Sequence, residues 1–302
     1  VWSPSVGVSV AVHSLVGGIV NRFVRDPLRS RWLSAWGHPA SFSAFCVSEA
    51  GAGSDVRSGR TSARRVDGGF RVNGEKMWVT NGMSARWLFA LVRLQGIAEN
   101  DNYCTLMVDA NQPAVSRTKI QGKMGIRGSE TAVIHFADAF VPEEHLIGGV
   151  GEGLKICSSS LHGGRIGIAA QATGIGEACL TAMVAYAKQR EQFGRPIASF
   201  QAIGEMIADS AVELEAAKAL VWRAACAVDA GETNRIASSM AKLYASEAAN
   251  RIAYRAVQVH GGAGYVHECR VEQLYRDARI TSIYEGTSEI QRIVIARELA
   301  KH

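Results

Sequence analysis

The pattern of hydrophobic and polar positions changes twice along the chain. Residues 1–42 hold an apolar run of small residues at 6–20, followed by an arginine-rich segment at 21–36. Proline removes a backbone donor and interrupts a helix. We therefore expect one helix that ends before Pro27 and a second, short helix that ends near Gly37.

The next part of the chain, residues 43–150, has the pattern of β-structure. Gly and Asp or Asn pairs that are typical of turns separate its short apolar runs, notably Asp67-Gly68 and Asn73-Gly74. The expected strands are residues 43–48, 60–66, 70–73, 87–94, 103–109 and 133–137. Because no helical period separates these runs, we expect a mainly antiparallel sheet and not a Rossmann-like one.

From residue 151 onward the period is helical. Apolar residues recur at three- and four-residue spacing between positions 203 and 228, which predicts one long amphipathic helix. Further helices are expected over residues 153–189 and 234–260, and a last one from about residue 288. Long helices with short connections predict an antiparallel bundle.

Composition narrows the classes of function. The 302 residues suffice for two or three domains, and 47% hydrophobic with 20% charged residues is typical of a folded protein. The net charge of +5 is too small an excess to indicate nucleic-acid binding. The six cysteines and the histidines lack metal-ligand spacing, so we expect reduced thiols and no metal site. No apolar run approaches 18 residues, and we therefore expect no membrane span.

Three motifs, two in loops and one on a predicted strand, have residues that suit ligand binding. The Gly-rich loop at 49–55 fits neither dinucleotide nor P-loop spacing, so its residues alone favour a plain turn. Trp78 and Thr80, two apart on a predicted strand, would offer a ring and a hydroxyl to a flat ligand, with core packing as the alternative. The loop at 260–265 suits either a helix C-cap or a phosphate contact.

The segment at 284–292 carries the strongest candidate for a general base. Ser288 and Gln291 have the spacing of a capping box, which predicts a helix start whose free N–H groups suit a phosphate. Glu285 precedes this start, between an aromatic residue and a glycine. A carboxyl in such a partly apolar loop would gain the raised pKa that a general base requires. A solvated loop glutamate is the alternative that the residues leave open.

Taken in order, eight segments of the chain resemble the acyl-CoA dehydrogenase family. These segments are residues 45–55, 73–82, 123–129, 141–144, 164–166, 190–196, 258–262 and 284–292. The resemblance implies a mainly α fold with a central antiparallel β-domain and a C-terminal four-helix bundle. The implied domains are residues 1–42, a remnant of an N-terminal helical domain, then 43–150 and 151–302. Since most of that first domain has no counterpart, we expect a fragment of a longer protein and not a shortened member.

The resemblance also implies an activity. The expected reaction is FAD-dependent α,β-dehydrogenation of a short-chain fatty or branched acyl-CoA to the trans-2-enoyl-CoA, with Glu285 removing the α-proton and hydride passing to the flavin. Some members place this base at the position that Gly164 occupies here, where no side chain can serve. The expected partners are acyl-CoA, an electron-transferring flavoprotein and further copies in a homotetramer. The expected compartment is the bacterial cytoplasm or the mitochondrial matrix.

Ligand contacts carried over from the resemblance fall into two sets. The FAD contacts are Phe45, Val47, Ser48, Trp78, Thr80, Arg190, Phe193, Gln201, Gln258, Gly261, Gly262, Thr287 and Glu289. Several of them, Arg190 included, reach the cofactor of a neighbouring subunit in the family. The substrate contacts are Ser54, His162, Arg165 and Gly286. An acyl-CoA oxidase that passes electrons to oxygen and a catalytically silent flavin-binding subunit are the alternatives that the sequence leaves open.

Overall fold

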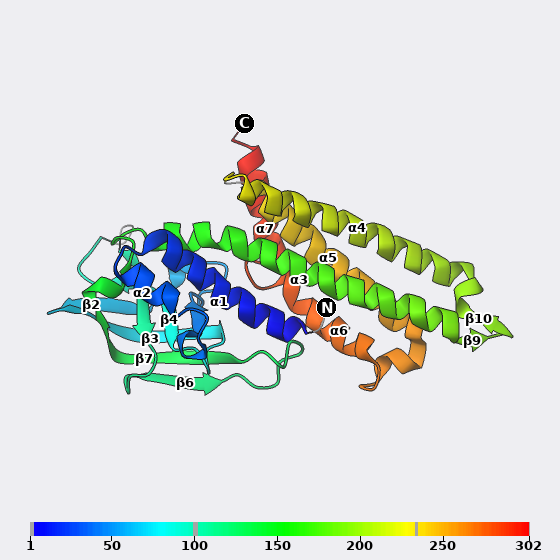
Figure 1. Ribbon diagram of the computed structural model, residues 1–302, viewed down its shortest axis with the longest axis horizontal. Helices are drawn as coiled ribbons and strands as arrows, with labels where there is room; N and C mark the ends of the chain where they lie inside the picture. The colour runs from blue at the N-terminus through cyan, green and yellow to red at the C-terminus, as the bar shows by residue number, and fades with distance from the viewer. Residues whose placement is uncertain (1–2, 99–101, 233–234, 302) are drawn as a thin grey trace. The chain divides into compact units, whose positions relative to one another are not determined.

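The computed structural model describes residues 3–98, 102–232 and 235–301, which form two compact units (Figure 1). The sheet unit comprises residues 5–123 and 128–161. The helical unit comprises residues 162–302 with the first four residues and residues 124–127. The predicted domain boundaries at 42/43 and 150/151 stay a prediction.

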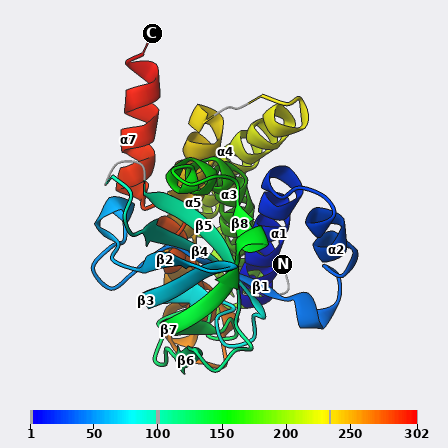
Figure 2. The ribbon, with the colours of Figure 1, turned by 90° about the vertical axis from the view of Figure 1, so that its left-hand side faces the viewer.

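One eight-stranded sheet dominates the sheet unit (Figure 2). Its strands are β1 (Ser43–Cys46), β2 (Ser62–Val66), β3 (Gly69–Thr80), β4 (Trp87–Leu94), β5 (Tyr103–Asp109), β6 (Val115–Lys119), β7 (Thr131–Pro142) and β8 (Leu146–Ile147). The order is β6-β7-β3-β2-β4-β5-β8, with β1 beside β4. Five of the described pairings are antiparallel, whereas β1 and β2 each run parallel to β4. The prediction of a mainly antiparallel sheet is therefore confirmed.

Two helices pack on the sheet: α1 (Pro4–Phe23) and α2 (Leu28–Ser34). Their ends agree with the helix limits predicted at Pro27 and Gly37. Val16 and Ile19 from α1, with Trp32 from α2, form a buried cluster with Phe89 and Met107 of the sheet. A second apolar cluster, which includes Phe70, Leu88 and Ile134, fills the rest of the sheet unit. Both clusters hold the strands that carry predicted ligand residues in fixed positions.

One predicted turn is wrong. Asp67-Gly68 does form a turn between β2 and β3, but Asn73-Gly74 lies inside β3. The pairing of β3 with β7 shifts register between Val72 and Asn73, which marks a β-bulge. A Cβ atom on Gly74 would lie 2.7 Å from Cα of Thr61. The glycine therefore serves a bulge and a close backbone approach instead of a hairpin.

Several elements were not predicted, among them two strands of the sheet and one helix. Strand β6 lies at an edge of the sheet and exposes most of its side chains, so it lacks the alternation of a half-buried strand. Strand β8 has only two residues. Helix α6 (Arg270–Arg279) has ten residues and buries few apolar side chains, among them Val271 and Leu274. The two strands depend on tertiary packing more than on their own sequence pattern, whereas the buried Val271, Leu274 and Ala278 of α6 do recur at helical spacing.

Long helices build the helical unit, together with a short hairpin. These elements are α3 (Gly153–Gln189), which begins in the sheet unit, β9 (Glu191–Gln192), β10 (Arg195–Pro196), α4 (Gln201–Asp229), α5 (Arg235–His260), α6 and α7 (Ser288–Leu299). The helices predicted at 153–189 and from 288 are confirmed. The helix predicted at 234–260 ends at His260 as expected. The first residue of that prediction, 234, lies outside the described residues. Small side chains on α5, such as Ala241, Ala245 and Ala249, are buried and allow close helix packing.

Short 3₁₀ segments connect these elements. They are η1 (Pro39–Ser41), η2 (Val56–Ser58), η3 (Glu143–His145), η4 (Ile197–Ser199), η5 (Gly261–Tyr265) and η6 (Ile280–Ser282). Two of them adjoin loops for which ligand contacts are predicted: η5 follows α5, and η6 leads into the loop before α7. Thus two of the predicted ligand-binding loops begin at the end of a helical turn.

Two helices are long and apolar enough to cross a membrane by length and composition alone. These are α1 and α3, each with a window of mean hydropathy 1.3, of which 33% and 39% of the residues are buried. The expectation of no span counted consecutive apolar residues, whereas a window average tolerates interspersed Gly, Ser and His. Core helices of soluble proteins pass the same test, so two such helices are weak evidence for a membrane span.

Candidate active site

Glu285 lies in the loop between η6 and α7, where the backbone is unusual. Its φ angle is +54°, and that of Gly286 is +89°. Glycine adopts this left-handed region at little cost, but a glutamate there is uncommon and strained. Such strain persists only where surrounding contacts hold the backbone, and it is frequent at functional sites.

The carboxyl group of Glu285 is buried although the residue as a whole is half-buried. Its Oε2 atom is inaccessible to solvent and has no hydrogen-bond partner within the described part of the chain. Burial raises the pKa of Glu285 to about 7, while the positive charges of Arg165 and Lys242 act in the opposite direction. A carboxyl whose pKa lies near neutrality can take up a proton at neutral pH and release it again.

Gly164 on α3 leaves the space that this carboxyl occupies. A Cβ atom on Gly164 would lie 2.5 Å from Oε2 of Glu285, a separation that real Cβ contacts do not show. The long helix therefore has to carry a glycine at this point for the carboxyl to keep its position.

Two side chains that the sequence did not assign to the site fix the loop. Lys242 on α5 is fully buried, and its Nζ donates a hydrogen bond of 2.7 Å to the carbonyl oxygen of Gly286. Gln291 on α7 is also fully buried, and its Nε2 donates to the carbonyl oxygens of Gly286 at 2.8 Å and Glu285 at 3.2 Å. Lys242 lies on the small-residue face of α5 that holds Ala245 and Ala249, and its burial there comes from the tertiary packing.

Arg165 and Tyr284 complete the surroundings of the carboxyl. Arg165 is 6% exposed, and its guanidinium donates to Oγ of Ser239 at 3.3 Å. Burial lowers the pKa of Arg165, and Glu285 acts against that shift. The hydroxyl of Tyr284 donates to Oε1 of Gln171, which orients the ring beside the candidate base. Of the four predicted substrate residues, Arg165 and Gly286 thus lie with Glu285.

The start of α7 differs by one residue from the capping box predicted at Ser288. The cap is Thr287, whose Oγ1 accepts a hydrogen bond of 3.3 Å from the backbone N–H of Ile290. Ser288 is the first helical residue, and its buried Oγ has no hydrogen-bond partner among the described residues. The Gln291 side chain turns back to the Glu285 loop instead of closing a box. Glu289 is exposed in the first turn, where the helix dipole favours a negative charge.

The other predicted FAD residues of the helical unit lie at its far end. These are Arg190, Phe193, Gln201, Gln258, Gly261 and Gly262. Along α3, about seven turns or roughly 40 Å separate Gly164 from the helix end that precedes Arg190. The ring of His260, at the end of α5, stacks on Tyr186 near the same end of α3, with centroids 4.3 Å apart. Within one chain these residues therefore form a group of their own, remote from Glu285.

The remote group is open to solvent. Phe193 is 93% exposed, with a φ angle of +53° in the hairpin between β9 and β10. Gln258 lines an open cavity of about 690 Å³ together with Arg251 and Arg255. Both arginines hydrogen-bond to the carboxylate of Glu213. The exposed ring of Phe193 suits contact with an aromatic molecule.

In the sheet unit, the predicted flavin residues come from two neighbouring segments. The backbone N–H of Met77 donates to the carbonyl oxygen of Ser48 at 2.9 Å, which places the segment after β1 against β3. Phe45 is half-buried and stacks on Phe89, with centroids 5.3 Å apart. Val47, whose carbonyl oxygen accepts from Lys76, lies in the same segment.

Trp78 stands at a second bulge of β3. The pairing with β7 shifts register between Lys76 and Val79, and Trp78 has a φ angle of +62°. This bulge interrupts the alternation from which a shared face of Trp78 and Thr80 was predicted. The indole is 57% exposed, so it offers an open aromatic surface.

A buried ion pair supports these segments. Nζ of Lys76, on β3, lies 2.7 Å from Oε1 of Glu49, and the two side chains are 2% and 11% exposed. Glu49 also accepts hydrogen bonds from the backbone N–H groups of Arg60 and Thr61. These donors hold the pKa of Glu49 down to about 2, although burial acts in the opposite direction. The pair ties the start of the Gly-rich loop to the sheet, while Ser54 at the end of that loop is exposed.

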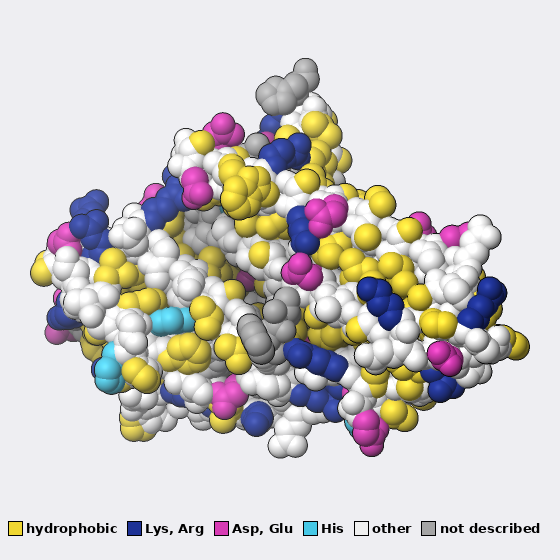
Figure 3. Space-filling model, turned by 45° about the vertical axis from the view of Figure 1, so that its right-hand side comes forward, with side chains coloured by type: hydrophobic (Ala, Val, Ile, Leu, Met, Phe, Trp, Pro, Cys, Tyr) yellow, Lys and Arg dark blue, Asp and Glu magenta, His cyan; other side chains and the backbone are white. Residues whose placement is uncertain are grey.

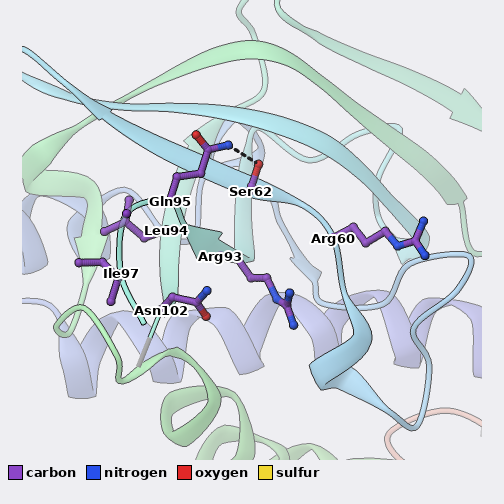
Figure 4. A pocket seen from close by; sticks show the side chains of 8 residues that line it. Arg60, Ser62, Arg93, Leu94, Gln95, Ile97 and Asn102 are labelled. Atoms are coloured by element: carbon purple, nitrogen blue, oxygen red, sulfur yellow. Dashed lines mark hydrogen bonds between the residues drawn. The ribbon is translucent and has the colours of Figure 1, made fainter. Parts of the chain in front are cut away.

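A separate cavity of the sheet unit contains none of the predicted site residues. It has a volume of about 410 Å³, and Arg60, Arg93 and Asn102 are among its lining residues (Figure 4). Gln95 donates a hydrogen bond of 3.2 Å to Ser62 at its wall. Over residues 3–98, 102–232 and 235–301, no cluster of three His, Cys, Asp or Glu side chains is placed to hold a metal ion.

Comparison with known proteins identifies the family. The profile of the acyl-CoA dehydrogenase middle domain matches residues 44–139, and the profile of the acyl-CoA dehydrogenase C-terminal domain matches residues 151–300. The chain belongs to the acyl-CoA dehydrogenase family. It is therefore an oxidoreductase of a class that depends on FAD.

Individual relatives agree with this assignment. Short-chain specific acyl-CoA dehydrogenase from mitochondria of Rattus norvegicus is 41% identical over 298 residues, which cover 98% of this chain and 72% of the rat protein. An acyl-CoA dehydrogenase of Bacillus subtilis is also 41% identical, over 98% of this chain and 79% of its own length. Butyryl-CoA dehydrogenase from Megasphaera elsdenii is 36% identical and superposes with a TM-score of 0.95, covering 99% of this chain and 79% of that one. The mainly α fold with a central β-domain and a C-terminal bundle is thereby confirmed.

Proposed function

We propose that this chain catalyses the α,β-dehydrogenation of a short-chain, straight or branched, acyl-CoA, with Glu285 as the base that removes the α-proton. The observation that carries the proposal is the buried Oε2 of Glu285, held without a hydrogen-bond partner in the described part of the chain and close to the space left by Gly164. The names of the rat and Megasphaera relatives support a short acyl chain.

The acid–base chemistry fits the geometry of this loop. A C–H bond next to a thioester carbonyl is a weak acid, so its base has to be desolvated and held in place. Burial gives Glu285 a pKa of about 7, which leaves a substantial carboxylate fraction at neutral pH. The contacts of Lys242 and Gln291 keep the loop from relaxing. The resemblance assigns the backbone N–H of Glu285 to the developing enolate oxygen, where a preformed donor stabilises charge.

The residues present fit the cofactor. FAD, when bound, supplies the acceptor for the hydride that leaves the β-carbon. The exposed indole of Trp78 offers a face for a flat ring. At the start of α7, the Ser288 hydroxyl, which has no hydrogen-bond partner among the described residues, offers a donor near Thr287 and Glu289. Phe45, Val47, Ser48 and Thr80 would hold the flavin end from the sheet unit, whereas Ser54, His162, Arg165 and Gly286 would contact the acyl-CoA.

A homotetramer is part of the proposal. The remote group at the end of α3 and α5 lies roughly 40 Å along the helix from Gly164, so within one chain it cannot serve the flavin beside Glu285. We assign Arg190, Phe193, Gln201, Gln258, Gly261 and Gly262 to the cofactor of a neighbouring copy. Figure 3 shows hydrophobic side chains gathered over the surface of the helical unit. Among the large apolar side chains of this unit, Trp222 is 74% and Phe193 is 93% exposed, which supports contacts between copies.

Electron-transferring flavoprotein is the proposed acceptor, and the bacterial cytoplasm or the mitochondrial matrix is the proposed compartment. The rat relative is mitochondrial and another relative is bacterial, which supports both locations. An oxidase would instead release hydrogen peroxide in air. A silent flavin-binding subunit would have no need of a desolvated carboxyl at position 285.

Anaerobic titration of the FAD-loaded protein with saturated acyl-CoAs of graded length tests this proposal. We expect the absorbance band of the oxidised flavin to bleach most completely with a short acyl chain. A bound flavin that no acyl-CoA bleaches would contradict the proposal. Peroxide release at the rate of substrate turnover in air would assign the oxidase reaction instead.

A further inference from the structure

Lys242 is a charged residue in a face of α5 that otherwise holds small side chains. It is fully buried, and its neighbours one turn away, Ser239, Ala245 and Ser246, are buried with it. Burial of an ammonium group is costly unless hydrogen bonds and opposite charge compensate for lost hydration. The side chain therefore has to be explained by what its Nζ contacts.

The contact of Nζ is the loop that carries the candidate base. It donates 2.7 Å to the carbonyl oxygen of Gly286, the residue next to Glu285. Gln291 donates to the same oxygen from α7, so two helices hold one carbonyl group. Glu285 and Gly286 both have left-handed backbone angles. Fixing the carbonyl of Gly286 fixes the peptide plane that follows Gly286, and the bond of Gln291 to the carbonyl oxygen of Glu285 fixes the plane before it. The direction of the Glu285 side chain depends on that backbone.

The charge of Lys242 also acts on the base. Arg165 from α3 and Lys242 from α5 are the two cations that favour the ionised form of Glu285. The carboxylates of Glu285, Glu289 and Glu247 act to raise the pKa of Lys242, whereas the charge of Arg165 acts to lower it. The charge of Arg235 in turn acts to lower the pKa of Arg165. Burial lowers the pKa of Lys242 to about 8, so the group carries its charge at pH 7. Without the charge of Lys242, Arg165 would be the remaining cation of this pair beside the desolvated Glu285 carboxyl, and the ionised form of Glu285 would be less stable.

We propose that Lys242 is a positioning residue for Glu285, which fixes the loop through the carbonyl of Gly286 and keeps the carboxyl ionised through its charge. The inference rests on the proposed function of Glu285 as the base. Lys242 thus acts in two ways, through its hydrogen bond and through its charge. Different substitutions can test the two effects separately.

Two substitutions at position 242 and one matched control test the proposal in the FAD-loaded protein. Lys242→Gln keeps a donor but removes the charge, whereas Lys242→Arg keeps the charge but changes the donor geometry. Lys218→Gln on α4, where the lysine pairs with exposed carboxylates, is the control. The rate of flavin reduction by a short acyl-CoA is measured against pH for each chain. A second readout does not depend on activity. For each residue at position 242, the free energy of unfolding is measured across pH for the chain with Glu285 and for its Glu285→Gln variant. The difference between the two reports the titration of Glu285.

We expect Lys242→Gln to move the acidic limb of the rate profile upward by about one pH unit, the lower end of the shift that one neighbouring charge produces. The rate at pH 7 would then fall roughly five-fold and recover in part at higher pH. The difference in free energy of unfolding between the chain with Glu285 and its Glu285→Gln variant would likewise change up to a pH about one unit higher. Lys242→Arg would keep the limb near its original pH while lowering the rate throughout, and Lys218→Gln would change neither.

A Lys242→Gln protein with the original limb and rate would overturn the proposal. Failure of both Lys242 variants to fold with bound FAD would overturn it as well, since it would assign the residue to stability. Failure of the proposed function has a different signature. In that case Glu285→Gln would retain turnover, while the unfolding comparison would still report whether Lys242 sets the titration of Glu285.

Discussion

Gly164 and Glu285 lie so close together that a single methyl group on the glycine would displace the carboxylate. A Cβ atom at position 164 would come within 2.5 Å of Oε2, although the two residues are more than a hundred positions apart in sequence. The small residue on α3 and the acidic residue before α7 thus form one feature. Because this close approach is possible only where residue 164 has no side chain, the spacing of residues along the sequence does not reveal it.

Substitution of Gly164 by alanine is predicted to impair the reaction without unfolding the protein. The added methyl group would push the Glu285 carboxyl out of position, and a misplacement of about 1 Å can cost roughly 100-fold in rate. Stopped-flow measurement of flavin reduction checks this. Gly163→Ala is the matched control, since a Cβ atom there meets nothing within 4 Å. Equal rates for the two variants would refute the steric role of Gly164.

The reaction is predicted to depend on pH through Glu285. Its raised pKa of about 7 means that the carboxylate form, which takes up the α-proton, increases as the pH rises through 7. The rate of flavin reduction should therefore increase from pH 6 to pH 8 with one ionisation near 7. The linkage to stability has the opposite sign. A folded-state pKa above the unfolded value of 4.5 adds stability below pH 4.5, and this contribution is lost as the pH rises to about 7. Chemical denaturation across this range, with Glu285→Gln as reference, measures that loss.

The ion pair between Lys76 and Glu49 is predicted to stabilise the sheet unit. Lys76→Met would leave the Glu49 carboxylate without its buried cation, at a cost of about 3 kcal/mol in the free energy of unfolding. The double variant Lys76→Met with Glu49→Gln should regain part of that loss, because it leaves no unpaired charge. Urea denaturation of the three proteins provides the comparison. If the double variant is the least stable of the three, the loss does not come from an unpaired charge.

Two neighbouring hydroxyls at the start of α7 are predicted to differ in their effect. Thr287→Ala removes the cap and should cost about 1 kcal/mol of stability. Ser288→Ala removes a hydroxyl without a partner among the described residues, so it should leave the stability of the FAD-free protein almost unchanged but weaken FAD binding. Thermal unfolding with and without FAD distinguishes the two. A larger stability loss for Ser288→Ala in the FAD-free protein would mean that Ser288 is the effective cap.

Much of the architecture follows from local patterns, and the exceptions have physical reasons. The limits of β4, β5 and α3 agree with their predicted ranges, because each segment carries a clear apolar period. The turn predicted at Asn73-Gly74 is wrong because the same residues that favour tight turns also favour bulges. The cap of α7 lies one residue before the predicted one because both Thr287 and Ser288 carry a suitable hydroxyl.

The candidate site can be predicted only in part from the sequence. Glu285 stands out through its loop context and the family resemblance, and its role as base remains a proposal. Lys242 does not stand out, because a lysine in an alanine-rich helix is usually solvated and only tertiary packing buries it. Within the helical unit, the separation of the predicted FAD residues into two groups also depends on the length of α3, which motif order along the chain does not convey.

The measurement that bears most directly on the central claim compares Glu285→Gln with the original chain in a single turnover. Both proteins are loaded with FAD, mixed anaerobically with a short acyl-CoA and followed by flavin absorbance. The glutamine keeps the size of the side chain but cannot accept the proton, so we predict a loss of at least roughly 100-fold in the rate of flavin reduction, with FAD still bound. Flavin reduction in the variant at close to the original rate would contradict the assignment of Glu285 as the base.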